Sequence, residues 1–154
     1  MHRFFKITLM DIYTLSNQFE TVDYQRFSKT EFSNLMKASD SATDRQRKAQ
    51  TLINYLCDKY GIERANVVIY DKPQNTFAQG RGKVFGDYTP NYKRIRIWNL
   101  TAKTHKVVAI KTFADTLIHE FIHHYDYKYL KMGDSIHTKG FYMRISDLKN
   151  KLSK

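Results

Sequence analysis

The residues of this chain that could most clearly carry out a chemical reaction are two histidines and a glutamate in the pentapeptide His119-Glu120-Phe121-Ile122-His123. On an α-helix, residues four positions apart lie on one face, so His119 and His123 can bind a single metal ion. Glu120 lies beside them, where its carboxylate can take a proton from a water that the metal activates. The HExxH pattern therefore predicts a hydrolytic zinc centre.

A catalytic zinc ion usually has three protein ligands, so a third must come from another part of the chain. No glutamate follows Glu120, which argues against zincins whose third ligand is a downstream Glu. The spacing HExxHxxGxxH also fails, because Asp126 stands where Gly is needed and Tyr129 where His is needed. The remaining candidates are His124, Asp126, Asp134, His137 and Asp147. His137 is well placed, because it follows the helix break at Gly133 and precedes the last predicted helix.

Three residues near the pentapeptide are predicted to support the site. Asp126 and Asp115 lie on the metal side of the helix, and a supporting role is expected because one helix rarely supplies a whole tetrahedral set. His124 lies about 100° round the helix from His123, so it should point away from the metal. Its side chain can orient Glu120, one turn earlier, or cover the surface. A donor to the reacting carbonyl oxygen is also expected, with Tyr125, Tyr142 and His124 as candidates.

Hydrophobic periodicity predicts the elements that hold these residues, in an α+β arrangement. A short helix through Met36 is expected to begin at a capping box, Ser28–Glu31, and a longer one at a second capping box formed by Thr43 and Gln46. Gly61 is placed to end the longer helix. Strands are expected within 66–70, 80–88 and 93–98, the metal-binding helix over about 106–132, and a last helix over about 138–152.

The segment Lys93–Trp98 alternates basic and apolar residues, which indicates a half-buried strand. Arg94 and Arg96 share one face of it. We expect this strand either to be a template for an extended substrate, which would add as an extra strand, or to be a sheet edge protected by charge. The length fits a single domain over residues 1–154, with residues 1–40 a poorly readable N-terminal extension.

The net charge of +11 is concentrated in the middle of the chain. Residues 67–110 contain eight Lys/Arg and two Asp/Glu, a net of +6. Such a charge favours polyanionic partners, including nucleic acid and nucleic-acid-bound proteins. A single cysteine, Cys57, rules out an internal disulfide and is predicted to be buried and inert. Neither a membrane-spanning run nor a secretory signal is found, so no membrane contact and a cytoplasmic location are expected.

The pairing of HExxH with His137-x-x-x-Phe141 resembles the SprT-like zinc metallopeptidases. The segment Arg94–Asn99 also looks like the strand that precedes the metal helix in that family, whereas Thr138 stands where the family commonly has Gly. The resemblance implies a minimal zincin-like domain, with a helix packed on a three- to four-stranded sheet, the HExxH helix and a C-terminal helix. It also implies zinc held by three histidines, with His137 as the third, and a protein or peptide substrate.

Three functions therefore remain open at this stage. The first is a zinc-dependent endopeptidase with Glu120 as general base, acting on proteins bound to or crosslinked with DNA, as the resemblance implies. The second is a zinc-stabilised binding module without turnover. The third is a basic nucleic-acid-binding protein in which the HExxH pattern is accidental. An intact Glu120 favours the first over the second, because a purely structural zinc site needs no general base.

Overall fold

The computed structural model describes residues 9–74 and 85–154. Its elements follow the chain in the order α1 (Leu9–Gln18), α2 (Thr30–Met36), α3 (Ala42–Tyr60), β1 (Asn66–Pro73), β2 (Gly86–Thr89), the short 3-10 turn η2 (Pro90–Tyr92), β3 (Arg94–Leu100), α4 (Ile110–Lys128) and α5 (Lys139–Ser153). The predicted α+β class is confirmed. Among the helices of these two ranges, none has the length and apolar character needed to cross a bilayer.

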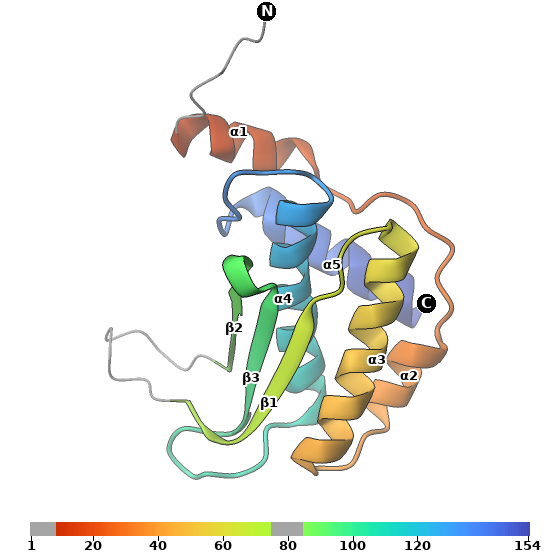
Figure 1. The fold of residues 1–154 in the computed structure, drawn as a ribbon, viewed down its shortest axis with the longest axis vertical. Helices are drawn as coiled ribbons and strands as arrows, with labels where there is room; N and C mark the ends of the chain where they lie inside the picture. Colours follow the sequence, from red (N-terminus) through yellow and green to blue (C-terminus); the bar gives the residue numbers. More distant parts are fainter. Residues whose placement is uncertain (1–8, 75–84) are drawn as a thin grey trace, which may run out of the picture.

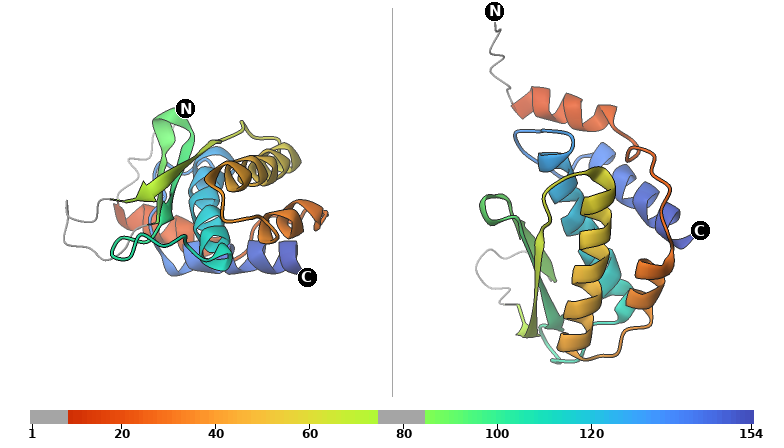
Figure 2. Two further views of the ribbon diagram at one scale, coloured as in Figure 1. Left: turned by 90° about the horizontal axis from the view of Figure 1, so that it is seen from below. Right: turned by 45° about the vertical axis from the view of Figure 1, so that its right-hand side comes forward.

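The elements form three layers, with the sheet at one side of the molecule. Its strand order is β1-β3-β2, with β1 parallel and β2 antiparallel to β3. Helices α3 and α4 pack on one face of the sheet, and α2 and α5 lie behind them (Figures 1 and 2). The core between the sheet and these helices is made by fully buried apolar side chains, among them Leu52, Leu56, Ile95, Ile97, Phe113, Leu117, Phe121 and Phe141.

Strand β3, which contains the predicted template strand, lies in the middle of the sheet. Ile95 pairs with Val67 of β1 on one side and with Tyr88 of β2 on the other. Both backbone edges of β3 are therefore hydrogen-bonded, so both predictions for this strand, a template for an extended substrate and a sheet edge protected by charge, are wrong. The alternation of Arg and Ile shows which side chains point to each face of the sheet. It carries no information on whether neighbouring strands pair with the backbone of β3.

The outer edge of β1 is occupied by two side chains of α3. Gln50 accepts a hydrogen bond from Val67 N (2.8 Å) and donates one to the Ala65 carbonyl (2.9 Å). Gln46 accepts from Ile69 N (2.7 Å) and donates to the carbonyl of Val67. The predicted capping box at Gln46 is therefore wrong, because this side chain is used for the edge of β1.

The helix starts differ from the predicted capping boxes for local reasons. Ser41, rather than Thr43, begins α3, and its side chain accepts from Asp44 N. In α2 the N-cap is Lys29, which makes no side-chain cap bond, while Ser28 Oγ accepts from Thr30 N at 3.2 Å. The predicted cap at the end of α3 is confirmed, since Gly61 adopts the left-handed conformation with φ of 65°.

Helix α4 is shorter than predicted at both ends. Val107 forms a bridge with Leu100, and Val108 N donates to the Asn99 carbonyl (2.8 Å), so the residues before Ile110 extend the sheet instead. At the other end α4 stops at Lys128, and a loop carries the chain to α5. The last helix is confirmed, with Thr138 as its N-cap. Of the strand expected within 80–88, residues 80–84 lie outside the described residues, and the observed strand begins at Gly86.

Residues 9–40 are the described part of the extension that was poorly readable from the sequence, and they pack against the core through Val22 and Leu35. Helix α1 lies along the end of α5, and the chain then runs past α5 to α2 (Figure 2). Asp23 fastens this stretch, because its backbone N donates to Tyr125 Oη (3.0 Å) and its carbonyl accepts from Tyr60 Oη (2.8 Å). The predicted buried thiol of Cys57 is confirmed in α3, and burial raises its pKa to about 11.

Candidate metal centre

Three histidine side chains meet at one point between α4 and the start of α5. His119 and His123 project from successive turns of α4, and His137 comes from the loop just before α5. The Nε2 atom of His137 lies 3.2 Å from that of His119 and 3.1 Å from that of His123. The structure thus brings together the three residues that the sequence proposed as ligands.

This arrangement fits a tetrahedral metal ion. With zinc–nitrogen bonds of about 2.0–2.1 Å, neighbouring ligand nitrogens in a tetrahedron are about 3.3 Å apart. Burial lowers the pKa of His119 to about 4 and that of His123 to about 3, and it also lowers the pKa of His137. Neutral imidazoles present the lone pairs that a metal needs. Without a cation, three partly buried ring nitrogens that face one another would have too few partners for these lone pairs. The three histidines are close enough to hold a metal ion.

Glu120 lies in the wall of the cavity beside these histidines. Only 6% of the residue is exposed, and its Oε2 is 4.0 Å from His119 Nε2. Burial raises the pKa of Glu120 to about 8, and the negative charge of Asp87 acts in the same direction. A divalent cation near this carboxyl would oppose both effects, because an adjacent positive charge favours the ionised form.

The cavity at the histidines has a volume of about 400 Å³. It is lined by Gly86, Asp87, Tyr88, Pro90, His119, Glu120, His123, Tyr127, Ser135 and His137. A hydrogen bond from Tyr127 Oη to Asp134 Oδ1 (2.9 Å) holds Tyr127 in this wall, where its ring stacks on Tyr88. Sequence analysis missed Tyr127, Asp87 and Ser135, because their place at the site depends on the loop conformation and on the pairing of β2.

The two arginines of β3 do not reach the histidines in any recorded contact. Arg96 forms a two-pronged ion pair with Asp87, with Nε 2.8 Å from Oδ1. This pair fixes a carboxylate on the cavity wall next to Glu120. Arg94 places its guanidinium carbon 5.3 Å from the centre of the Tyr92 ring. Arg96 is thus a support for the wall, whereas Arg94 packs beside η2.

Asp126 supports His123 through an intervening serine. Ser135 Oγ donates a hydrogen bond to Asp126 Oδ2 (2.7 Å) and lies 2.7 Å from His123 Nδ1. The carboxylate also accepts from Arg144 at both oxygens, at 3.0 and 2.9 Å, and both side chains of this ion pair are 0% exposed. A hydroxyl has only one proton, and Ser135 uses it for the hydrogen bond that it donates to the Asp126 carboxylate. His123 therefore donates from Nδ1, which leaves its Nε2 free to bind a metal.

His124 points away from the metal centre, as its position on the helix predicted, but it does not cover the surface. Its ring is fully buried, with Nε2 2.7 Å from the Glu63 carbonyl and Nδ1 2.7 Å from Tyr88 Oη. Burial lowers its pKa, so the neutral ring donates from Nε2 and accepts from the tyrosine. His124 thus ties β2 and the loop after α3 to the metal helix, and no recorded hydrogen bond links it to Glu120.

The other sequence candidates do not join the histidine cluster. Asp115 lines a neighbouring pocket together with His119 and Glu120, and it forms an ion pair with Lys149 (2.6 Å) between α4 and α5. Asp147 accepts from Val22 N (2.9 Å), far from the histidines in the fold. Tyr125 is fully buried, with its hydroxyl accepting from Asp23 N, and it does not line the cavity of the histidines, which removes it as a donor to a reacting oxygen there. The ring of Tyr142 lies 6.2 Å from that of His119 and is half exposed, so it remains at the margin of the site.

The lowered pKa of His123 predicts a specific acid sensitivity. The unfolded chain has the ordinary value of 6.5, so below that pH it binds more protons than the folded state, and stability falls as pH falls. The raised pKa of Glu120 makes stability change with pH in the opposite direction. The contribution of His123 is therefore obtained by comparing wild type with His123→Gln, in which Glu120 is still present. We expect the stability difference between the two metal-free proteins to fall by up to about 1.4 kcal/mol per pH unit below pH 6.5. Urea unfolding at pH 7.5, 6.0 and 5.0 measures it, and a constant difference would contradict the shift.

Comparisons with protein-family models, with curated proteins and with solved structures found no match.

Proposed function

We propose that this protein is a zinc-dependent endopeptidase of the SprT-like class. The observation that carries the proposal is the convergence of three histidine Nε2 atoms beside a buried glutamate in one cavity. A zinc ion held by His119, His123 and His137 would supply Lewis acidity, which activates water and polarises a peptide carbonyl. The presence of Glu120 favours hydrolysis over a purely structural site, because the three histidines alone would hold the metal.

The residues of the chain have separate tasks in this reaction. Glu120 accepts the proton of the attacking water and delivers it to the leaving amine. Ser135 and Asp126 keep the His123 ring in the orientation and tautomer in which Nε2 faces the site. Tyr127 lines the cavity, and the hydrogen bond from its hydroxyl to Asp134 holds its ring in place, so it shapes the space available to a substrate.

The edge strand β2 supports a peptide as the substrate. Three of its residues, Gly86, Asp87 and Tyr88, line the cavity. No described element pairs with the side of β2 that faces away from β3. An extended peptide hydrogen-bonded to this edge would place its backbone alongside the histidines. Strand addition is thus proposed at β2, in place of the central strand that the sequence suggested.

The proposal is tested by zinc content and peptide hydrolysis of the same preparation. We expect about one zinc ion per chain and chelator-sensitive cleavage of an unfolded protein such as casein. His137→Ala should lose most of the zinc, because two histidines on one helix leave the site incomplete. Lys139→Ala is a matched control, since this exposed residue is the first of α5 and lies two positions after His137. Zinc binding without any cleavage would favour a binding module, and absence of zinc after reconstitution would overturn the proposal.

A second candidate function rests on a group of lysines at the C-terminal ends of β1 and β3. Pro73 pairs with Leu100 there, which brings Lys72 next to the loop that follows β3. In the described parts of the chain, no ion pair involves Lys72, Lys103, Lys106 or Lys111. Such a surface favours a polyanion, including nucleic acid that carries the protein substrate. Nucleic-acid binding unaffected by chelator, in a protein that binds no zinc, would place this function first.

A further inference from the structure

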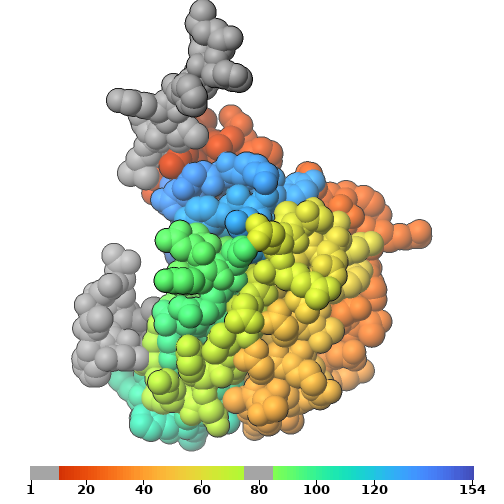
Figure 3. Space-filling model, viewed as in Figure 1, coloured from red at the N-terminus to blue at the C-terminus, as the bar shows by residue number. Residues whose placement is uncertain are grey.

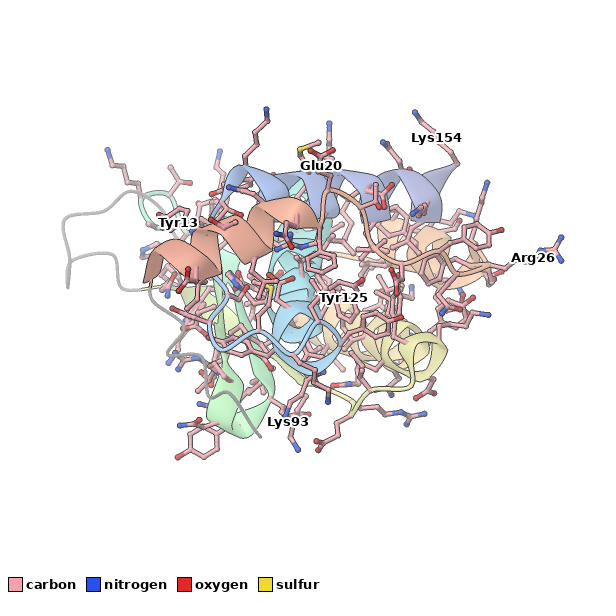
Figure 4. All side chains as sticks on the ribbon, turned by 90° about the horizontal axis from the view of Figure 1, so that it is seen from above. Tyr13, Glu20, Arg26, Lys93, Tyr125 and Lys154 are labelled. Carbon is pink, nitrogen blue, oxygen red and sulfur yellow. The ribbon has the colours of Figure 1, made fainter. Side chains whose placement is uncertain are left out.

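The end of α1 makes buried hydrogen bonds with the segment that carries the third histidine. Ser16 Oγ lies 2.7 Å from Thr138 Oγ1, and Thr138 directly follows His137. Asn17 Oδ1 accepts a hydrogen bond from Gly140 N (2.8 Å) in the first turn of α5. Seen from above, α1 lies alongside α5 (Figure 4), and it borders the blue segment between α4 and α5 (Figure 3). These contacts join α1 to the loop of the metal centre.

A second set of bonds runs from the same end of α1 to His123. Arg144 donates from Nη1 to the carbonyls of Ser16 (2.6 Å) and Phe19 (2.7 Å), and from Nη2 to Ser16 Oγ (3.1 Å). The same guanidinium holds Asp126, whose hydrogen bond from Ser135 continues to the imidazole. Ser16, Asp126 and Arg144 are all 0% exposed, so the bonds among these three residues restrict their neighbours more strongly than they would at the surface.

The two backbones also touch, which leaves little freedom for one to move without the other. A Cβ atom on Gly140 would lie 2.4 Å from the Ser16 carbonyl oxygen and 2.8 Å from Asn17 Cα. Only glycine permits this approach. A displacement of the end of α1 would therefore be transmitted to the first turn of α5, three residues from His137.

We propose that the C-terminal end of α1, Ser16–Phe19, is a positioning element of the metal centre. It holds His137 in place through Thr138, and it holds His123 through Arg144 and the Asp126–Ser135 pair. The affinity for the metal is then set in part by a helix that contributes no ligand. This inference rests on the metal-binding part of the proposed function and does not require peptide hydrolysis.

The test compares zinc affinity and a metal-free property of His123 in the full chain. Ser16→Ala removes the α1 side-chain bonds to Thr138 and Arg144, and Ser135→Ala cuts the link to His123. Tyr60→Phe is the matched control, because it removes a bond of similar length between the core and the N-terminal segment that leads to no ligand. Zinc affinity is measured by chelator competition. In the metal-free protein, NMR measures how fast the His123 Nδ1 proton exchanges with water.

We expect zinc affinity to fall about tenfold in Ser16→Ala and in Ser135→Ala, and less than twofold in Tyr60→Phe. The His123 Nδ1 proton should exchange at least about tenfold faster in both serine variants than in wild type, since its hydrogen-bonded path is loosened. Unchanged affinity in Ser16→Ala, or an equal loss in Tyr60→Phe, would overturn the inference. If wild type bound no zinc, the proposed function would fail, and the exchange of the His123 proton would still decide this inference.

Discussion

Replacing Glu120 with Gln is expected to slow peptide hydrolysis by about 10²- to 10⁴-fold without loss of zinc. The amide has almost the same shape as the carboxylate, but it cannot accept the proton of the attacking water. The histidine ligands are separate from it, with Glu120 Oε2 4.0 Å from His119 Nε2. Hydrolysis of a fluorogenic peptide library and zinc content of each preparation measure the two effects.

Glu63→Gln is the control for this change. It makes the same chemical substitution at an exposed carboxylate, which pairs with Lys93 and Lys128 away from the cavity. We expect its activity and zinc content to match those of wild type. A Glu120→Gln protein that kept more than about a tenth of the activity would exclude Glu120 as the general base.

Replacing Asp126 with Ala is expected to destabilise the protein by about 3–5 kcal/mol. The change would leave the Arg144 guanidinium buried and without its counter-charge, since both side chains are 0% exposed. That loss is a large fraction of the roughly 5–15 kcal/mol by which domains are usually stable. Urea unfolding of the metal-free protein measures the effect, so that loss of zinc does not contribute to it.

A second Asp–Arg pair of this chain provides the control. Asp58 accepts two hydrogen bonds from Arg64, from Nε at 3.1 Å and from Nη2 at 2.7 Å, in the same two-pronged geometry. Both of these side chains are more than half exposed. Asp58→Ala should therefore leave the urea midpoint almost unchanged, because water replaces the lost partner. Equal losses in the two variants would show that burial does not determine the strength of these pairs.

The cluster of three histidines was predictable from the sequence because its members follow short spacings. His119 and His123 are four residues apart on a helix, and His137 lies just beyond the next helix break. The direction of His124 followed from the same helical geometry, but its burial did not. It depends on the Glu63 carbonyl and on Tyr88, which the fold brings from two other elements.

The supporting contacts were not readable, because their partners lie far apart in the sequence. Arg144 carries a charge on an amphipathic helix, which predicts an exposed side chain, yet it is fully buried with partners 18 and 128 positions away. Gln46 fitted a capping box by spacing alone, whereas the edge of β1 competes for its amide. The central position of β3 in the sheet was also not predictable, because the alternation of basic and apolar residues within one strand does not determine the order of the strands.

The two glutamines of α3 have a consequence for how the molecule avoids self-association. An exposed strand edge is a template for pairing with another copy of the chain, which is a common route to aggregation. Gln46 and Gln50 satisfy the outward-facing backbone groups of β1 at Val67 and the N–H of Ile69, so the first half of this edge has little left to offer a second strand. Replacing both with Leu would keep the helix and free that edge, creating a protein prone to form fibrils through β1.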